Sequence, residues 1–72
     1  MNNTLLKQKR EEANYSQRRI AEEMHITTRT YLKKENSFVD AAGRVSKFTY
    51  SEKLLIKKLL NLSAKDFKNI FE

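Results

Sequence analysis

The sequence has no cysteine, no proline, no tryptophan and only one glycine, Gly43. Without cysteine, neither disulfides nor thiolate-bound metal ions can stabilise the fold. Without proline, almost nothing interrupts a helix, and Gly43 marks the main irregular segment. A chain of 72 residues forms one small domain, so its stability must come from helix packing, with or without a partner chain.

Long apolar runs are missing as well. No run approaches the roughly 20 residues of a membrane span. The N-terminal segment Met-Asn-Asn-Thr-Leu-Leu-Lys has no basic stretch before an apolar one, which a signal peptide would require. We therefore expect a cytoplasmic protein with no membrane partner.

The residue patterns of catalysis are sparse. His25 is the only histidine, so a metal site or a nucleophile–base pair would lack its other members. There is no glycine-rich phosphate loop, and the paired acids Glu11–Glu12 and Glu22–Glu23 are neighbours on a helix, which point about 100° apart. We expect no enzyme, no cofactor, no metal ion and no small-molecule substrate.

Basic charge is what the chain has in excess. Fifteen Lys and Arg outnumber nine Asp and Glu, for a net charge of +6 and a pI of about 9.8. Each half of the chain carries +3, so no basic tail explains the excess. Such a domain favours an anionic partner, such as nucleic acid or an acidic protein.

Apolar spacing and capping residues predict an all-α fold of five helices without strands. Ser16 and Thr27 stand where N-caps belong, and Thr49 with Glu52 forms a capping-box pattern, as does Ser63 with Asp66. The expected helices cover about residues 4–13, 17–24, 28–36, 50–60 and 64–71, and residues 37–48 form an extended loop.

The expected helix over 50–60 is apolar around roughly two thirds of its circumference. Either a second chain or the helix over 64–71 covers the excess.

The most informative segment is 17–36, which predicts two short helices joined by a tight turn at His25 and Ile26. This pattern is typical of a helix-turn-helix that places its second helix in the major groove of DNA. Ala21 is small where the two helices would cross, Ile26 would fill the space under the turn, and Tyr31 would anchor the second helix from behind.

The outward face of that second helix holds hydrogen-bond donors and methyl groups, with no acid before Glu35. Arg29 or Lys33 suits guanine, and the methyl groups of threonine or leucine suit thymine. A solvated helix on an ordinary bundle can carry similar residues, so this face by itself does not decide the function. Its members are Thr27, Thr28, Arg29, Leu32 and Lys33.

The whole pattern resembles the lambda-repressor-like family of small DNA-binding domains, also called the Cro or XRE type. The matching positions are Gln17, Ile20, Ala21, Met24, Ile26, Thr27, Thr30, Tyr31, Glu35 and Asn36. Residues 48–52 and 62–71 are similar to small regulators of temperate phages of Gram-positive bacteria. The resemblance covers residues 5–71 and implies a compact five-helix fold with a helix-turn-helix at its second and third helices.

The resemblance also implies residue roles. Thr28, Arg29 and Lys33 would read bases, and Gln17 would touch phosphate or base at the edge of the site. Thr27 and Asn36 would contact phosphate, with Arg18 and Lys34 as weaker candidates. The full set of expected DNA contacts is Gln17, Arg18, Thr27, Thr28, Arg29, Leu32, Lys33 and Asn36. Arg10 and Glu35 would form a structural ion pair between the first helix and the end of the third.

Three features depart from the family pattern. His25 stands where the turn usually has glycine, and Lys34 stands where an apolar core residue is usual. The segment 37–47 is longer than the usual link. It would add phosphate contacts through Arg44 and Lys47, obstruct DNA, or bind a protein.

Two functions follow from the resemblance. The first is a phage-type transcriptional regulator that binds double-stranded operator DNA as a homodimer and blocks a promoter by steric occlusion. The alternative is an antirepressor, or modulator of repression, that forms a mixed complex with a phage repressor protein. An antitoxin would fit the fold but has no specific support in the sequence.

Overall fold

The computed structural model describes all 72 residues and contains five helices. They are α1 (Asn3–Glu12), α2 (Gln17–Glu23), α3 (Thr28–Glu35), α4 (Tyr50–Leu59) and α5 (Ala64–Phe71). The prediction of an all-helical fold is confirmed, and each helix end lies within one residue of its expected position. No helix is long and apolar enough to cross a membrane.

A short polar side chain caps the N-terminus of every helix. The hydroxyls of Ser16, Thr27, Thr49 and Ser63 each accept a hydrogen bond from a backbone amide three residues later, as the sequence predicts. Asn2 does the same for α1. These bonds satisfy amides that have no partner inside the helix.

Four helices end without glycine. Asn14, His25, Ser37 and Asn61 follow α1 to α4 with φ between 51° and 62°, a conformation that side chains other than Asn, Asp and His seldom adopt. At each end the following residue donates its amide to a carbonyl five positions earlier, as in Ile26 to Ala21 at 3.0 Å. This is the Schellman arrangement, in which an apolar residue after the left-handed one packs back on the helix.

The apolar residues that follow the four helix ends differ in how far they are buried. Tyr15 and Ile26 are partly buried against the core and Leu62 is buried, whereas Phe38 is 46% exposed. Three of the four helix ends therefore close over the core, and the end of α3 leads away from it.

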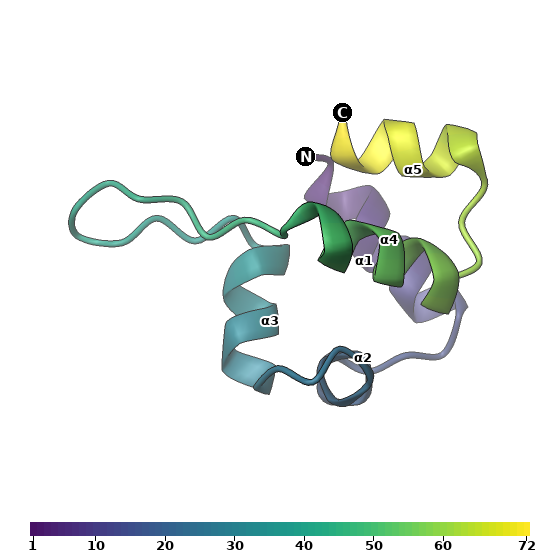
Figure 1. Ribbon diagram of the computed structural model, residues 1–72, viewed down its shortest axis with the longest axis horizontal. Helices are drawn as coiled ribbons and strands as arrows, with labels where there is room; N and C mark the ends of the chain where they lie inside the picture. The colour runs from purple at the N-terminus through teal and green to yellow at the C-terminus, as the bar shows by residue number, and fades with distance from the viewer.

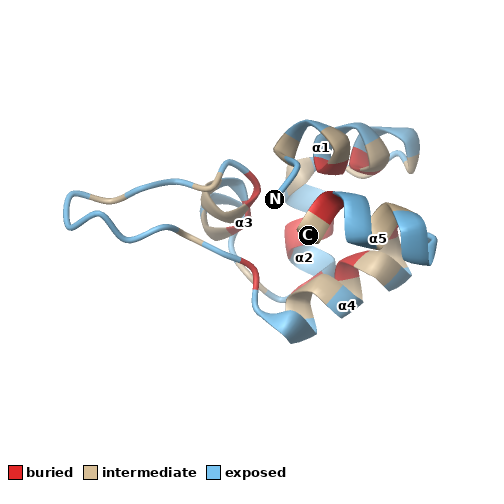
Figure 2. Ribbon diagram, turned by 90° about the horizontal axis from the view of Figure 1, so that it is seen from above, coloured by how far each residue is buried: buried red, intermediate tan, exposed pale blue.

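Ten buried side chains from all five helices and the flanking segments form one core. Figure 2 colours these residues red, together with the buried Arg10 and Glu35. They are Leu6, Ile20, Ala21, Met24, Tyr31, Phe48, Ile56, Leu60, Leu62 and Ile70. The chain ends meet beside it, where the Asn2 amide donates to the Ile70 carbonyl at 2.7 Å.

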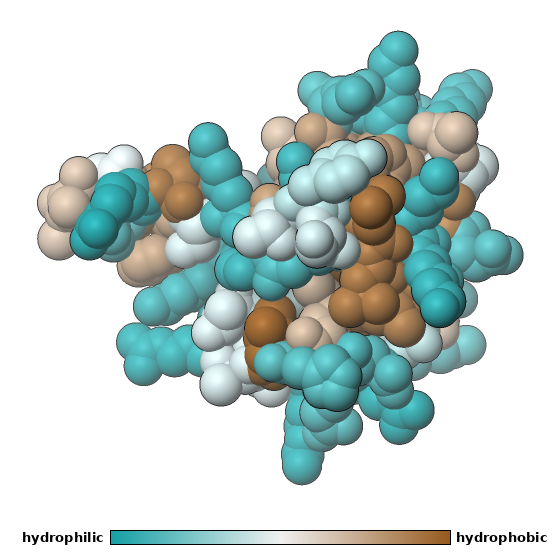
Figure 3. All heavy atoms as spheres, in the orientation of Figure 1, coloured by the Kyte–Doolittle hydropathy of each residue, from teal (hydrophilic) through white to brown (hydrophobic).

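Helix α5 contacts α4 through two aromatic rings. The rings of Phe67 and Phe71 lie 5.2 Å apart, and the ammonium groups of Lys57 and Lys53 of α4 sit 5.5 and 5.7 Å from their respective centroids. Leu54 remains 44% exposed, and Figure 3 shows an apolar strip over α4 on the visible face. The apolar surface of α4 is therefore covered only in part by α5.

Residues 38–46 form a hairpin arm instead of an irregular loop. Val39 and Val45 make an isolated antiparallel bridge, and the Ser46 amide donates to the Phe38 carbonyl at 2.8 Å. At the tip, a carboxylate oxygen of Asp40 accepts from the amides of Ala42 and Arg44, both at 2.9 Å. The arm projects well beyond the helices in both ribbon views (Figures 1 and 2).

An ion pair fixes α4 against α3. Lys34 places its ammonium group 2.7 and 2.8 Å from the two carboxylate oxygens of Glu52, and both side chains are less than a fifth exposed. The same carboxylate accepts from the Thr49 amide at 2.8 Å, which completes the capping box of α4. Lys34, which stands where the family usually has an apolar core residue, is thus largely buried and has its charge paired within the protein.

This pair predicts a loss of stability in acid. Burial alone would raise the pKa of Glu52, but the hydrogen bonds from Lys34 and the Thr49 amide outweigh it and lower the pKa below its ordinary value of 4.5. Because the folded state binds this proton less tightly, the stabilisation is complete above pH 4.5 and is lost as the pH falls through the lowered pKa. We expect Glu52→Gln to lower the free energy of unfolding at neutral pH and to flatten its decline in acid, measured by urea denaturation across pH. An equally steep acid decline in the variant would contradict this assignment.

Candidate nucleic-acid interface

Helix α3 packs against α2 and presents its opposite side to solvent. Ala21 of α2 is 1% exposed and Tyr31 of α3 is fully buried, so the two helices approach closely there. The turn between them contains His25 with φ of 59°, the left-handed conformation for which histidine is among the more tolerated residue types. Ile26 follows and packs partly buried against the core.

A buried polar network holds α3 from behind. Arg10 of α1 donates from Nε to Glu35 Oε2 at 3.0 Å and from Nη2 to Oε1 at 3.4 Å, and its Nη1 donates to the Tyr15 carbonyl at 2.7 Å. The Tyr31 hydroxyl donates to the same Glu35 carboxylate. The ion pair expected between Arg10 and Glu35 is thus present, with side chains only 6% and 2% exposed.

Tyr31 joins this network as a neutral donor. Its burial, followed by its hydrogen bond to Glu35 and the charge of that carboxylate, raises its pKa far above the ordinary value. Every buried polar side-chain atom in the protein has a hydrogen-bond partner. The network therefore joins α1, the turn after α1 and α3 without an orphaned charge.

The outward side of α3 carries side chains without partners in the protein. Thr28 and Arg29 are exposed in its first turn, and Leu32 one turn later is 38% exposed. No ion pair joins Arg29, although six other cations are paired. This end of the helix offers a free guanidinium, a hydroxyl and methyl groups side by side.

The other predicted contact residues divide into two groups. Gln17 and Arg18 lie in the first turn of α2, and Arg18 pairs with Glu22 at 3.3 Å while remaining 82% exposed. Thr27 is the N-cap of α3, with its hydroxyl hydrogen-bonded to Thr30 at 2.8 Å. These residues lie in the first turn of α2 and at the beginning of α3.

Lys33 and Asn36 lie at the other end of α3. Asn36 is its exposed C-cap residue. The Lys33 ammonium lies 5.2 Å from the centre of the Phe38 ring, a cation–π contact that directs it toward the hairpin arm. Lys33 is therefore held near the base of the arm, one helical turn from Arg29.

The arm supplies less free positive charge than the sequence suggests. Arg44 pairs with Asp40 through Nε and Oδ2 at 3.2 Å, so the tip is locally neutral. Lys47 at the base remains without an acidic partner. The exposed side chains of the arm include three large apolar ones, Phe38, Val39 and Val45.

Two features of this region were not predicted from the sequence. The Lys34–Glu52 pair joins residues 18 positions apart, and no local pattern indicates such a partner. The hairpin had a recognisable signal, because Asp40 and Gly43 stand at the first and last positions of a four-residue turn flanked by Val39 and Val45. No group of three or more histidine or acidic side chains is placed to hold a metal ion.

The buried network predicts strong coupling between its members. Arg10→Met would leave the Glu35 carboxylate buried without its cation, and we expect it to lower the free energy of unfolding by about 3 kcal/mol. The double variant Arg10→Met, Glu35→Met removes both charges, so it should be more stable than Arg10→Met alone. Urea denaturation of both single variants and the double variant measures the coupling energy. Simple additivity of the two losses would show that the pair is not a coupled unit.

Comparisons with known proteins assign no family and no function to the chain. No protein-family model, no curated protein and no solved structure matches the chain. The functional argument therefore depends on the exposed end of α3, the residues around it and the hairpin arm.

Proposed function

We propose that the protein is a lambda-repressor-like helix-turn-helix regulator of the phage type, which binds operator DNA through α3. In this proposal α2, the turn at His25 and α3 form the helix-turn-helix, and the bound protein blocks a promoter by steric occlusion. No chemical step is required. The site of action is the bacterial cytoplasm, where its operator would lie.

The observation that carries the proposal is the contrast between the two sides of α3. One side is fixed by the buried Tyr31 and Glu35, and the other offers exposed Thr28 and Arg29 without partners. A helix held rigidly from behind, with donors free at its N-terminal end, meets the requirements of major-groove recognition. Arginine can bind guanine O6 and N7 with two parallel hydrogen bonds, and a threonine methyl suits thymine.

Residues around α3 would position the duplex. Gln17 and Thr27 lie at the N-terminal ends of α2 and α3, where side chains and backbone amides commonly contact phosphate. Arg18, Leu32, Lys33 and Asn36 complete the proposed contact surface. The arm extends from the opposite end of α3 (Figure 1), so it would lie beside a duplex bound along this helix.

Replacement of Arg29 tests base recognition. With a duplex selected from a random-sequence pool by the wild-type protein, we expect Arg29→Ala to weaken binding by about 1–3 kcal/mol and to relax the preference at one base pair. Gel-shift titrations against the selected duplex and its point variants measure both effects. Arg18→Ala should weaken binding to all sequences and reduce the salt dependence.

The matched control is Lys65→Ala, which removes one positive charge from the exposed surface of α5. Figure 1 places α5 at the end of the molecule opposite α2, so this variant should bind the selected duplex as the wild type does. Failure to select any sequence, or equal losses for Arg29→Ala and Lys65→Ala, would refute operator recognition through α3.

The arm favours one alternative, an antirepressor that forms a mixed complex with a phage repressor protein. Phe38, Val39 and Val45 are 46%, 56% and 42% exposed. These three apolar side chains cannot donate hydrogen bonds to phosphate. The pairing of Arg44 with Asp40 also reduces its attraction to phosphate. Exposed apolar side chains grouped in this way are typical of protein–protein contacts.

Two isosteric changes distinguish the functions. Val39→Thr and Val45→Thr together keep the β-branched shape of the arm while replacing methyl groups with hydroxyls. If the protein is an antirepressor, this double variant should lose affinity for the repressor encoded beside its own gene by at least about tenfold, or 1.4 kcal/mol, measured by calorimetry. If it is an operator-binding regulator, the variant should retain its gel shift. Retained repressor affinity in the variant would exclude the arm as the contact surface.

A further inference from the structure

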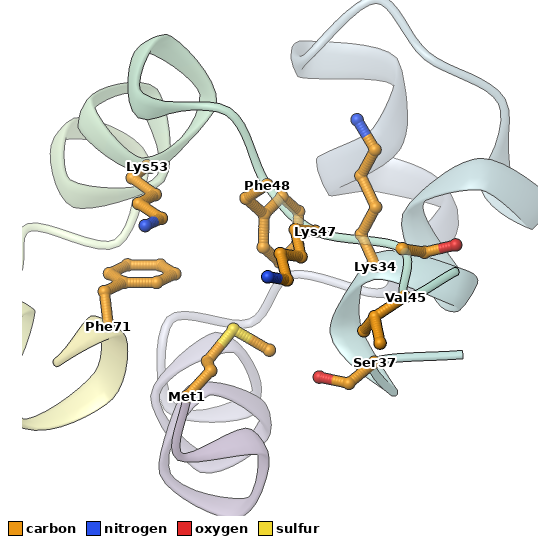
Figure 4. Close-up of a pocket in the computed structure, with 9 residues that line it drawn as sticks. Met1, Lys34, Ser37, Val45, Lys47, Phe48, Lys53 and Phe71 are labelled. Carbon is orange, nitrogen blue, oxygen red and sulfur yellow. The ribbon is translucent and has the colours of Figure 1, made fainter. Parts of the chain in front are cut away.

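A hollow of about 360 Å³ lies where the base of the arm meets the helices. Its walls come from the end of α3, the arm base, α4 and the end of α5, as Figure 4 shows. This volume falls within the range of small-molecule pockets. The lining residues on which the argument depends are Met1, Lys34, Lys47, Phe48, Lys53 and Phe71.

The lining contains three lysines and no acid. Lys34 is neutralised by Glu52 from outside the hollow, and in Figure 4 its side chain points away from the rings of Phe48 and Phe71. The ammonium groups of Lys47 and Lys53 lie beside these rings, and neither forms an ion pair. Two unneutralised charges therefore face one small volume.

Aromatic rings form the apolar walls. Phe48 is 5% exposed and packs edge-on to Phe71 with their centroids 6.2 Å apart. Lys53 lies 5.7 Å from the centre of the Phe71 ring, so its position is partly fixed by that contact. The Met1 side chain lies beside the two rings in Figure 4.

We propose that this hollow binds a carboxylate attached to a small apolar group. The two carboxylate oxygens would accept hydrogen bonds from Lys47 and Lys53, and charge-assisted bonds of this kind are the stronger ones. The apolar group would lie against Phe48 and Phe71. A free aromatic acid and the C-terminal carboxylate of a peptide that ends in an aromatic residue present this same chemistry.

Such a ligand would connect two separate parts of the molecule. Lys47 belongs to the base of the arm and Lys53 to α4. A carboxylate held by both would restrain the arm relative to the helices. The arm amides in residues 38–46 should therefore respond to binding together with those that line the hollow. This site is independent of the proposed function, since none of its free lysines lies on α3.

Amide NMR spectra of the full chain test the proposal. Phenylacetate should produce saturable shifts at residues 45–48 and around Lys53 and Phe71, whereas phenylacetamide, which has the same shape without the charge, should not. Lys47→Met and Lys53→Met should each weaken phenylacetate binding by about tenfold. Lys68→Met, which changes an exposed lysine of α5 outside the hollow, should bind as the wild type does.

Three results would overturn the proposal. Equal binding of phenylacetamide would show that only apolar contact matters, and equal binding of inorganic phosphate would show that only charge matters. An equal loss in Lys68→Met would show that the attraction is spread over the surface. Each variant is first checked for an unchanged thermal unfolding transition.

A second titration distinguishes the two sources of the carboxylate. The tripeptide Gly-Gly-Phe is compared with the same peptide carrying a C-terminal amide. Binding of the free-acid peptide at least about tenfold tighter than phenylacetate, abolished by amidation, supports a peptide C-terminus as the ligand. Weaker binding of both peptides than of phenylacetate supports a free small acid.

Discussion

The position of α3 depends on the buried contact between Arg10 and Glu35. A carboxylate that is 1% exposed is costly to keep charged in the interior unless its oxygens are all satisfied. Here the guanidinium of α1 and the hydroxyl of Tyr31 both donate to it, and Arg10 also donates to the Tyr15 carbonyl after α1. These bonds require one orientation of α1 relative to α3, so the network fixes the direction in which the opposite side of α3 faces solvent.

The helix ends give the fold its second constraint. Four of the five helices end in a left-handed residue that is not glycine, and each is followed by an aromatic or aliphatic residue. Tyr15, Ile26 and Leu62 return the chain to the core, and their burial offsets the conformational cost of the turn. Phe38 follows the same local turn but is 46% exposed, with the Lys33 ammonium over its ring, and the chain then leaves the helical body as the hairpin arm.

Pairing among the charged residues decides where the excess positive charge can act. Six cations are matched with acids, among them Lys34 and Arg44, which the sequence alone would count as free. The matched pairs leave Arg29 free at the beginning of α3, and they leave Lys47 and Lys53 facing the hollow beyond its other end. The unpaired positive charges therefore lie at separate sites with different surroundings. The net charge of +6 does not form one basic surface.

The sequence by itself determined the helices and the way they begin, because a cap such as Ser16, Thr27 or Thr49 acts on an amide only three residues away. It also placed Ala21 and Tyr31 where α2 and α3 pack together, and it marked the exposed end of α3. The Arg10–Glu35 pair was expected only through the family resemblance. Its partners are 25 residues apart, and no local spacing connects them.

Only the tertiary structure decided the features that join distant segments. It paired Lys34 with Glu52, which lies 18 residues further along the chain. It also brought Lys47, Lys53, Phe48 and Phe71 around one hollow. Each of these contacts depends on the angle between elements, which is set by side-chain packing in the core and is not encoded in the periodicity of any single segment.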